Sequence, residues 1–167
     1  MEMKKILLGL IKLSAIGGII GGIAYLANKS LSKESNMKNR FRAYYNVTNQ
    51  WLSNKNADKE VGSYFKDNNY KTIAIYGMGS MAELFYNELK KSNPEIKVAY
   101  FIDKNSEELY YGLDDISVIG LNEICSQDEV DAIIVTPVYD FDVINEDLIE
   151  VGVEADIISL EDVVYEI

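Results

Sequence analysis

The chain of 167 residues contains no histidine and a single cysteine, Cys125. These absences exclude disulfides within the chain, zinc sites built from histidine and cysteine, and a histidine general base. Basic residues become scarce after residue 71. Residues 72–167 hold 4 Lys/Arg against 22 Asp/Glu, whereas residues 1–71 hold 12 against 5, so the net charge changes from +7 to −18. An acidic body of this size repels phosphate backbones, and we therefore expect no nucleic-acid partner.

What is present is enough apolar sequence for one folded domain. Apolar residues make up 48% of the chain, and 167 residues are expected to hold one domain plus attachments, without room for a second globular domain.

The first segment of the chain is long and apolar. Residues 6–27 are interrupted only by Lys12 and Ser14, which is about the 20 residues that a membrane-spanning helix requires. We expect residues 1–28 to form a transmembrane anchor in membrane lipid. Its glycines form two overlapping Gly-x-x-x-Gly pairs, which are typical of homodimeric helix contacts in lipid but also occur simply as small residues: Gly17, Gly18, Gly21 and Gly22.

Basic residues favour one side of this segment. Five follow it, Lys29, Lys33, Lys38, Arg40 and Arg42, and two precede it, Lys4 and Lys5. The positive-inside rule then predicts a single-pass protein of the cell membrane with a cytoplasmic C-terminal domain. Two alternatives remain: a cleaved signal peptide ending near Ala24, or a helix that lies on the membrane surface or inserts on assembly.

Residues 29–70 are interpreted as a linker followed by helices. Residues 28–35 are polar, which suggests a flexible connector. An amphipathic helix follows, with one face formed by Met37, Phe41, Tyr44, Tyr45, Thr48, Trp51 and Leu52. This face would dock on the following domain, lie on anionic headgroups, or pair with a partner helix. A second short helix is expected at residues 58–67.

The stretch Thr72–Tyr76 is an apolar strand that leads directly into Gly77-Met78-Gly79-Ser80-Met81-Ala82 and a helical pattern. In a nucleotide-binding turn the first glycine allows the bend, the second lets the backbone approach a pyrophosphate, and the third small residue lets the helix pack on its strand. The helix N-terminus offers N–H groups to a phosphate. Asp103 follows Ala82 by about 20 residues, where a ribose-binding acid is expected, and Lys104 adjoins it.

Strands and helices alternate from residue 71 onward. Strands are predicted at 72–76, 97–102, 116–119, 131–136 and 155–158, and helices at 80–91, 121–127, 141–150 and 160–166. This pattern predicts an α/β fold: a five-stranded parallel Rossmann-like sheet over residues 71–167, in the order 3-2-1-4-5. The ligand crevice would open at the carboxyl ends of the first and fourth strands, with Thr136 and Pro137 facing the Gly77 loop.

Less specific interpretations compete with this site. The two glycines could form only a sharp turn, with Asp103 capping the next segment. Tyr86 and Lys90 match the Tyr-x-x-x-Lys pair of short-chain reductases, but they lie on the helix directly after the glycine turn, where we expect them to pack and to be solvated rather than to catalyse. The acidic pairs at 107–108, 114–115 and 128–129 indicate solvated loops, and we assign no metal site and no catalytic residue.

The stretches 71–79, 98–104, 118–120, 130–137 and 157–163 together resemble Rossmann-like domains of bacterial surface-polysaccharide proteins. Similar modules occur in membrane-anchored sugar-nucleotide dehydratases and glycosyl-phosphate transferases, and in small proteins of capsule gene clusters. The resemblance implies a crevice for NAD or a nucleotide-sugar formed by Gly77, Gly79, Ala82, Asp103 and Thr136, with polysaccharide-assembly proteins as partners.

Two functions follow as hypotheses. The first is a membrane-tethered module that binds NAD or a nucleotide-sugar and has an accessory or regulatory role in surface-polysaccharide biosynthesis. The second is an enzyme, or an enzyme subunit completed by a partner, that acts on a nucleotide-linked sugar. A structural membrane scaffold is a third.

Overall fold

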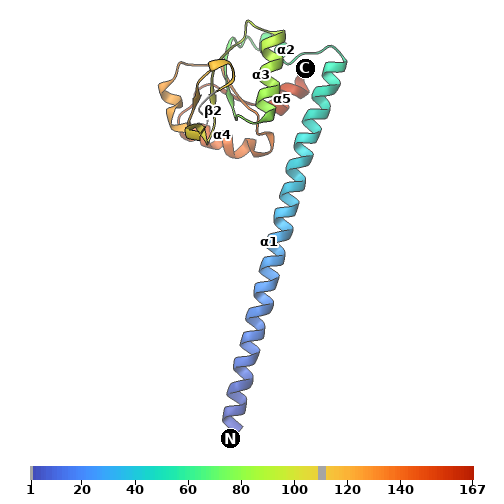
Figure 1. Cartoon of the computed structure of the whole chain (residues 1–167), viewed down its shortest axis with the longest axis vertical. Helices are drawn as coiled ribbons and strands as arrows, with labels where there is room; N and C mark the ends of the chain where they lie inside the picture. The colour runs from blue at the N-terminus through green and yellow to red at the C-terminus, as the bar shows by residue number, and fades with distance from the viewer. Residues whose placement is uncertain (1, 109–111) are drawn as a thin grey trace. The chain divides into compact units, whose positions relative to one another are not determined.

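The computed structural model describes the backbone of residues 2–108 and 112–167, and the side chains of residues 25–108 and 112–167. The chain divides into two compact units, Met1–Arg42 and Ala43–Ile167. The second unit contains a β-sheet with helices on both of its faces (Figure 1). It holds every residue that the sequence assigns to a nucleotide site.

The sheet has five parallel strands in the order β3-β2-β1-β4-β5, which confirms the predicted α/β fold and strand order. The strands are β1 Thr72–Tyr76, β2 Lys97–Ile102, β3 Val118–Ile119, β4 Ala132–Val135 and β5 Asp156–Ser159. The strands β1 and β4 are buried almost throughout, as expected when helices cover both faces of a parallel sheet. Strand order reverses between β1 and β4, which is where such sheets carry their ligand crevice.

One face of the sheet packs against α2 Gly62–Asp67, α3 Ser80–Ser92 and α5 Leu160–Glu166. The other packs against α4 Phe141–Glu150 and the 3₁₀-helix η3 Leu121–Ser126. Three single 3₁₀ turns complete the second unit: η1 Ser106–Glu108, η2 Leu113–Asp115 and η4 Val138–Asp140. Side chains of β1 alternate between the two cores, since Ile73 and Ile75 face α3 whereas Ala74 and Tyr76 face α4.

The helix α1 runs from Glu2 to Asn56 without interruption. The prediction of a flexible connector at residues 28–35 was therefore wrong. Residues 28–56 contain no glycine and no proline, so nothing in this stretch interrupts the i→i−4 hydrogen-bond ladder even though its side chains are polar. The predicted second helix is shorter than expected and starts at Gly62, after a turn in which Asp58 has φ +58°.

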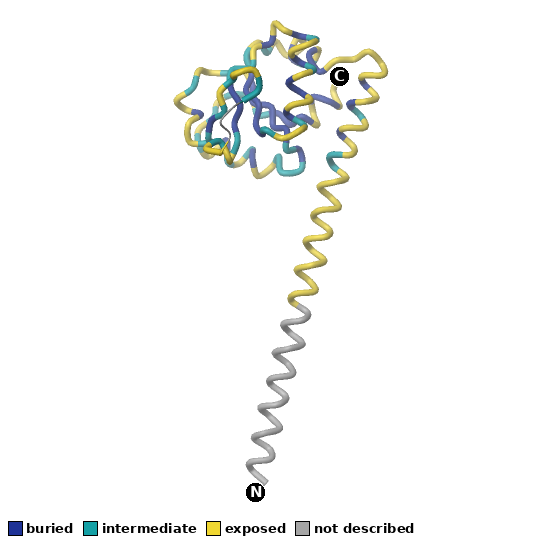
Figure 2. The backbone as a smooth tube through the Cα atoms, viewed as in Figure 1, coloured by how far each residue is buried: buried dark blue, intermediate teal, exposed yellow. Residues whose placement is uncertain are grey.

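The apolar face predicted for residues 37–52 is divided in the structure. Val47, Trp51 and Asn54 are buried, and the Asn54 amide donates a hydrogen bond to the carbonyl of Val164 in α5 at 2.6 Å. Tyr44 is half-buried and packs against the same core. Four large side chains of the predicted face are exposed, and Figure 2 draws residues 25–42 as exposed: Met37, Phe41, Tyr45 and Leu52. Docking on the domain thus uses a face formed by Val47, Trp51 and Asn54.

In the part of the chain whose side chains are described, no helix is long and apolar enough to cross a membrane. The predicted span at residues 6–27, with Gly17, Gly18, Gly21 and Gly22, falls almost wholly outside that part. The transmembrane anchor and the dimer contact through these glycines stay predictions.

Candidate functional site

The glycine turn directly follows β1, and only the first of its two glycines has a backbone conformation that requires glycine. Gly77 has φ +99°, in the region that side-chain-bearing residues avoid, and its N–H donates to the carbonyl of Ile102 at 2.7 Å. A Cβ at this position would lie 2.8 Å from the Thr136 hydroxyl and 3.1 Å from Pro137 Cδ. The turn therefore lies directly against the end of β4.

Gly79 is different from Gly77 in both respects. It is the N-cap of α3 with φ −83° and ψ 179°, an extended conformation open to any residue. A Cβ on Gly79 would have no atom within 4 Å, and both Gly79 and Ser80 are exposed. The first turn of α3 thus presents its N–H groups toward open space, which is the arrangement that binds phosphates at helix N-termini.

Asp103 follows β2 and holds the glycine turn in place. One carboxylate oxygen accepts the N–H of Met78 and the other accepts the N–H of Asn105, each at 2.9 Å. This is the capping role that competed with ribose binding. A carboxylate has about four acceptor sites, so these two bonds leave acceptor capacity on a half-buried side chain.

The other predicted site residues have different surroundings. Thr136 is buried, and its hydroxyl donates to the carbonyl of Tyr76 at 2.9 Å, so it packs on β1 instead of facing an open crevice. Pro137 is half-buried beside it. Ala82 is fully buried, and Met81 packs against the same core, which is the close helix packing expected of the third small residue. Lys104 is exposed and pairs with Asp147 of α4 at 3.3 Å.

Tyr76, next to the glycine turn, is a further residue of this region that was not predicted from the sequence. Tyr76 ends β1 and is buried on the α4 face, and its hydroxyl is fully buried without a hydrogen-bond partner in the described part of the chain. Burial, together with the nearby Asp147 and Asp103, raises the pKa of Tyr76 to about 12. A buried hydroxyl without a partner costs about 1–3 kcal/mol. The alternation of side chains along β1 predicts that Tyr76 faces α4. Nothing in the sequence indicates that its hydroxyl lacks a hydrogen-bond partner.

Tyr86 and Lys90 form a cluster away from the glycine turn. Both side chains bind the same carboxylate, Asp114 of η2, and the Tyr86 ring packs edge-on against Phe101. Burial and the bond to Asp114 raise the pKa of Tyr86 to about 12. Proton transfer by a Tyr-x-x-x-Lys pair needs the tyrosine pKa lowered, so this geometry favours a packing role.

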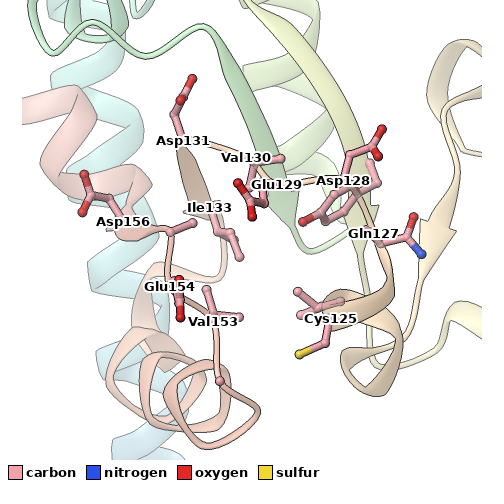
Figure 3. A pocket seen from close by; sticks show the side chains of 14 residues that line it. Cys125, Gln127, Asp128, Glu129, Val130, Asp131, Ile133, Val153, Glu154 and Asp156 are labelled. Carbon is pink, nitrogen blue, oxygen red and sulfur yellow. The ribbon is translucent and has the colours of Figure 1, made fainter.

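A second region, at the opposite ends of the strands, was not predicted. A cavity of about 620 Å³ opens beside the amino ends of β4 and β5. Figure 3 shows residues that line it, and the lining comes from η3, the loops before β4 and β5, and the strands β2, β4 and β5. Five carboxylates line it, Asp128, Glu129, Asp131, Glu154 and Asp156, with Tyr100 and Cys125. The pair at 128–129 was predicted to be solvated loop. The available sequence signal was that neighbouring parallel strands bring the acids preceding both strands to one edge of the sheet.

Within the described residues, no cluster of three or more acidic or cysteine side chains could hold a metal ion.

Comparison with known proteins adds a family. The family model described as "C2185-like, N-terminal" matches residues 68–159, which is more than half of the chain. The chain belongs to the C2185-like N-terminal family. No curated protein and no solved structure matches it. The C2185-like N-terminal match contains all five strands, the glycine turn, Asp103 and the acidic cavity, whereas α1, α2 and α5 lie outside it.

Proposed function

We propose that this chain binds a nucleotide, NAD or a nucleotide-sugar, at the glycine turn. The observation that carries the proposal is the open space around Gly79 at the N-terminus of α3. A pyrophosphate there would accept N–H groups of the first helical turn and would be stabilised by the helix dipole. The site lies at the switch point between β1 and β4, where ligands bind in open parallel sheets.

Asp103 supports the same proposal from the side of β2. Its two bonds to backbone N–H groups fix the orientation of the carboxylate, and the remaining lone pairs are available to a ribose diol. The unpaired Tyr76 hydroxyl lies among the charges of Asp103 and Asp147, so a polar group or water held there would relieve its burial cost.

The cellular role is proposed on the sequence alone. Residues 6–27 would tether the domain to the membrane with the acidic body in the cytoplasm. The bound nucleotide or nucleotide-sugar would then serve an accessory or regulatory role beside polysaccharide-assembly proteins, in keeping with the resemblance described above.

Calorimetric titration of the full-length chain in detergent with NAD and with UDP-glucose tests the binding proposal. We expect Gly79→Val to abolish binding because the side chain would fill the space that the phosphate needs. The variant should remain folded, at a cost of about 1 kcal/mol for the lost N-cap preference, since a Cβ at this position meets no neighbour within 4 Å. Asn87→Val, an exposed substitution further along α3, is the matched control and should bind as the wild type does.

Two results would contradict the proposal. One is the absence of saturable binding of either ligand to the wild-type chain at concentrations up to about 1 mM, which corresponds to less than about 4 kcal/mol of binding free energy. The other is undiminished affinity in a folded Gly79→Val variant.

A further inference from the structure

Tyr76 is the last residue of β1 and directly precedes Gly77. Its carbonyl accepts the N–H and the hydroxyl of Thr136, so its backbone is fixed between the glycine turn and the end of β4. Its side chain enters the core on the α4 face, 3% exposed, and the hydroxyl has no hydrogen-bond partner within the described residues. Phenylalanine would fill the same space without an unpaired hydroxyl, so packing alone does not explain a tyrosine here.

An ion pair lies on the same face of the sheet and at the same end as Tyr76. Lys104 follows the end of β2, which is paired with β1, and it binds Asp147 of α4 at 3.3 Å. Ile144 and Leu148, on either side of Asp147 in α4, belong to the same core cluster as Tyr76. Burial and the charge of Asp147 raise the pKa of Tyr76 to about 12, so this carboxylate acts on the phenol.

Lys104 is also placed to meet an anion at the glycine turn. Residues 72–167 hold four basic residues against 22 acidic ones. Lys90 and Lys91 end α3 and Lys97 begins β2, which puts these three toward the amino ends of the strands. Lys104 instead follows the carboxyl end of a strand, the end that carries the glycine turn. A pyrophosphate there would lie beside the Asp103 carboxylate, so a cation at this end of the sheet favours its binding.

The pair of Lys104 with Asp147 can be exchanged at small cost. The two side chains are 60% and 34% exposed, and exposed ion pairs contribute little because water solvates both charges. If Lys104 turned to a phosphate, Asp147 would lose its cation. The Tyr76 hydroxyl is an unpaired donor on the same face, and a carboxylate accepts such a hydroxyl in a strong, charge-assisted hydrogen bond.

We propose that nucleotide binding exchanges these partners: Lys104 leaves Asp147 for the pyrophosphate, and Asp147 accepts the hydroxyl of Tyr76. The proposal rests on the nucleotide site at the glycine turn and adds to it a binding cation and a positioning residue. It couples occupancy of the turn to α4, because a residue of that helix changes its partner. The unpaired hydroxyl then belongs to the ligand-free state and is satisfied in the bound state.

Thermal unfolding of the full-length chain in detergent, without ligand, tests the hydroxyl first. Tyr76→Phe should raise the unfolding temperature by about 2–5 °C, because it removes a buried hydroxyl that has no partner. Tyr86→Phe is the matched control. It removes the hydroxyl of another buried tyrosine, one that donates to Asp114 at 2.7 Å, and should not raise the unfolding temperature.

Calorimetric titration with NAD and with UDP-glucose, both of which contain a pyrophosphate, measures the exchange. Lys104→Gln and Tyr76→Phe should each weaken binding about tenfold, the effect of one lost charge-assisted hydrogen bond. Lys97→Gln removes the same charge from the exposed start of β2 and should leave the affinity unchanged, as should Tyr86→Phe. A merely structural Tyr76 would change the unfolding temperature without changing the affinity.

Asp147→Ala distinguishes an exchange of partners from two independent contacts. This variant lacks the proposed acceptor of the Tyr76 hydroxyl. Adding Tyr76→Phe to Asp147→Ala should therefore change the affinity by less than about twofold, in contrast to about tenfold in the wild-type background.

Four outcomes would overturn the proposal. One is a lower unfolding temperature of ligand-free Tyr76→Phe, which would mean that the hydroxyl is already bonded. Another is wild-type affinity in Tyr76→Phe or Lys104→Gln while Gly79→Val abolishes binding, which would leave the nucleotide site without the exchange. The third is an equal effect of Tyr76→Phe with and without the Asp147 carboxylate. The last is the absence of binding to the wild-type chain, which would remove the nucleotide site and the exchange together.

Discussion

Two glycines of one turn have unlike roles at the residue scale. Gly77 has a positive φ, and a Cβ there would come too close to Thr136 and Pro137, so the fold requires a residue without a side chain at this position. Gly79 has an ordinary φ and open space around it, so the fold makes no such demand. A glycine that the fold does not require, at the N-cap of a helix, is more informative about a ligand than one that packing explains.

Gly77→Ala should destabilise the protein by about 2–4 kcal/mol, because left-handed strain adds to overlap with Thr136 and Pro137. Gly79→Ala should cost less than about 1 kcal/mol, the size of an N-cap preference. Urea denaturation of the two variants measures the difference. Equal losses would mean that the turn has another conformation than the one described.

Asp103 combines a structural role with the proposed binding role. It accepts N–H groups from Met78 and Asn105, so removing the carboxylate would loosen the glycine turn as well as any ribose contact. An Asp103 variant would therefore lose stability together with any ribose contact. Gly79→Val is the cleaner test of nucleotide binding for that reason.

At the scale of elements, the C-terminal end of α1 is joined to the sheet domain through Glu88 of α3. This carboxylate accepts the Trp51 indole N–H at 2.7 Å and the Val61 N–H at 3.1 Å, and pairs with Lys55 at 3.2 Å. Its side chain is 11% exposed, so these charge-assisted bonds are partly shielded from water. One acid therefore holds the end of α1 and the segment leading into α2.

Glu88→Ala should lower the free energy of unfolding by about 2–3 kcal/mol, because two N–H donors lose a charged acceptor. Trp51 is the single tryptophan of the chain, so its fluorescence reports the same contact and should shift to longer wavelength as the indole becomes exposed. Glu146→Ala, at an exposed position of α4, should change stability by less than about 0.5 kcal/mol. If Glu88→Ala lowered the free energy of unfolding no more than this control does, Glu88 would not hold the end of α1 on the sheet domain.

For the whole molecule, which is rich in carboxylates, we expect stability to fall at acid pH wherever a carboxylate is hydrogen-bonded in the folded state. Asp131 connects the starts of β4 and β1 by accepting the N–H groups of Lys71 and Thr72, and these bonds lower its pKa below the ordinary value of 3.8. A carboxylate with a lowered folded-state pKa stabilises the fold above its unfolded pKa, and this contribution is lost as pH falls through the folded-state value.

Asp131→Ala should therefore be less stable than the wild type by about 1 kcal/mol at pH 7, a small value because the side chain is exposed. The gap should shrink as pH falls from about 5 toward 2, where the wild-type carboxylate becomes protonated. Urea denaturation across this pH range measures it, with Asp67→Ala as the exposed control. A gap that stays constant with pH would mean that the effect of the substitution is not carried by the charge.

The sequence by itself determined the sheet. Five apolar runs separated by helical patterns, with right-handed crossovers, predicted the strand order, and β1 and β2 begin and end at the predicted residues. Local signals suffice there because a strand that is buried on both faces is apolar along its length, and a sharp β-to-α turn needs a residue such as Gly77.

Only the tertiary structure decided what depends on residues far apart in the chain. Val47 and Trp51 of α1 are buried against residues far along the chain, among them Glu88, which accepts the Trp51 indole N–H from 37 residues away. Helical periodicity alone therefore could not separate Val47 and Trp51 from the exposed Phe41 and Leu52. The acidic cavity joins Tyr100 to segments around residues 125–133 and 152–156. Its chemistry arises because parallel strands bring their amino ends to one edge of the sheet, which no single stretch of sequence displays.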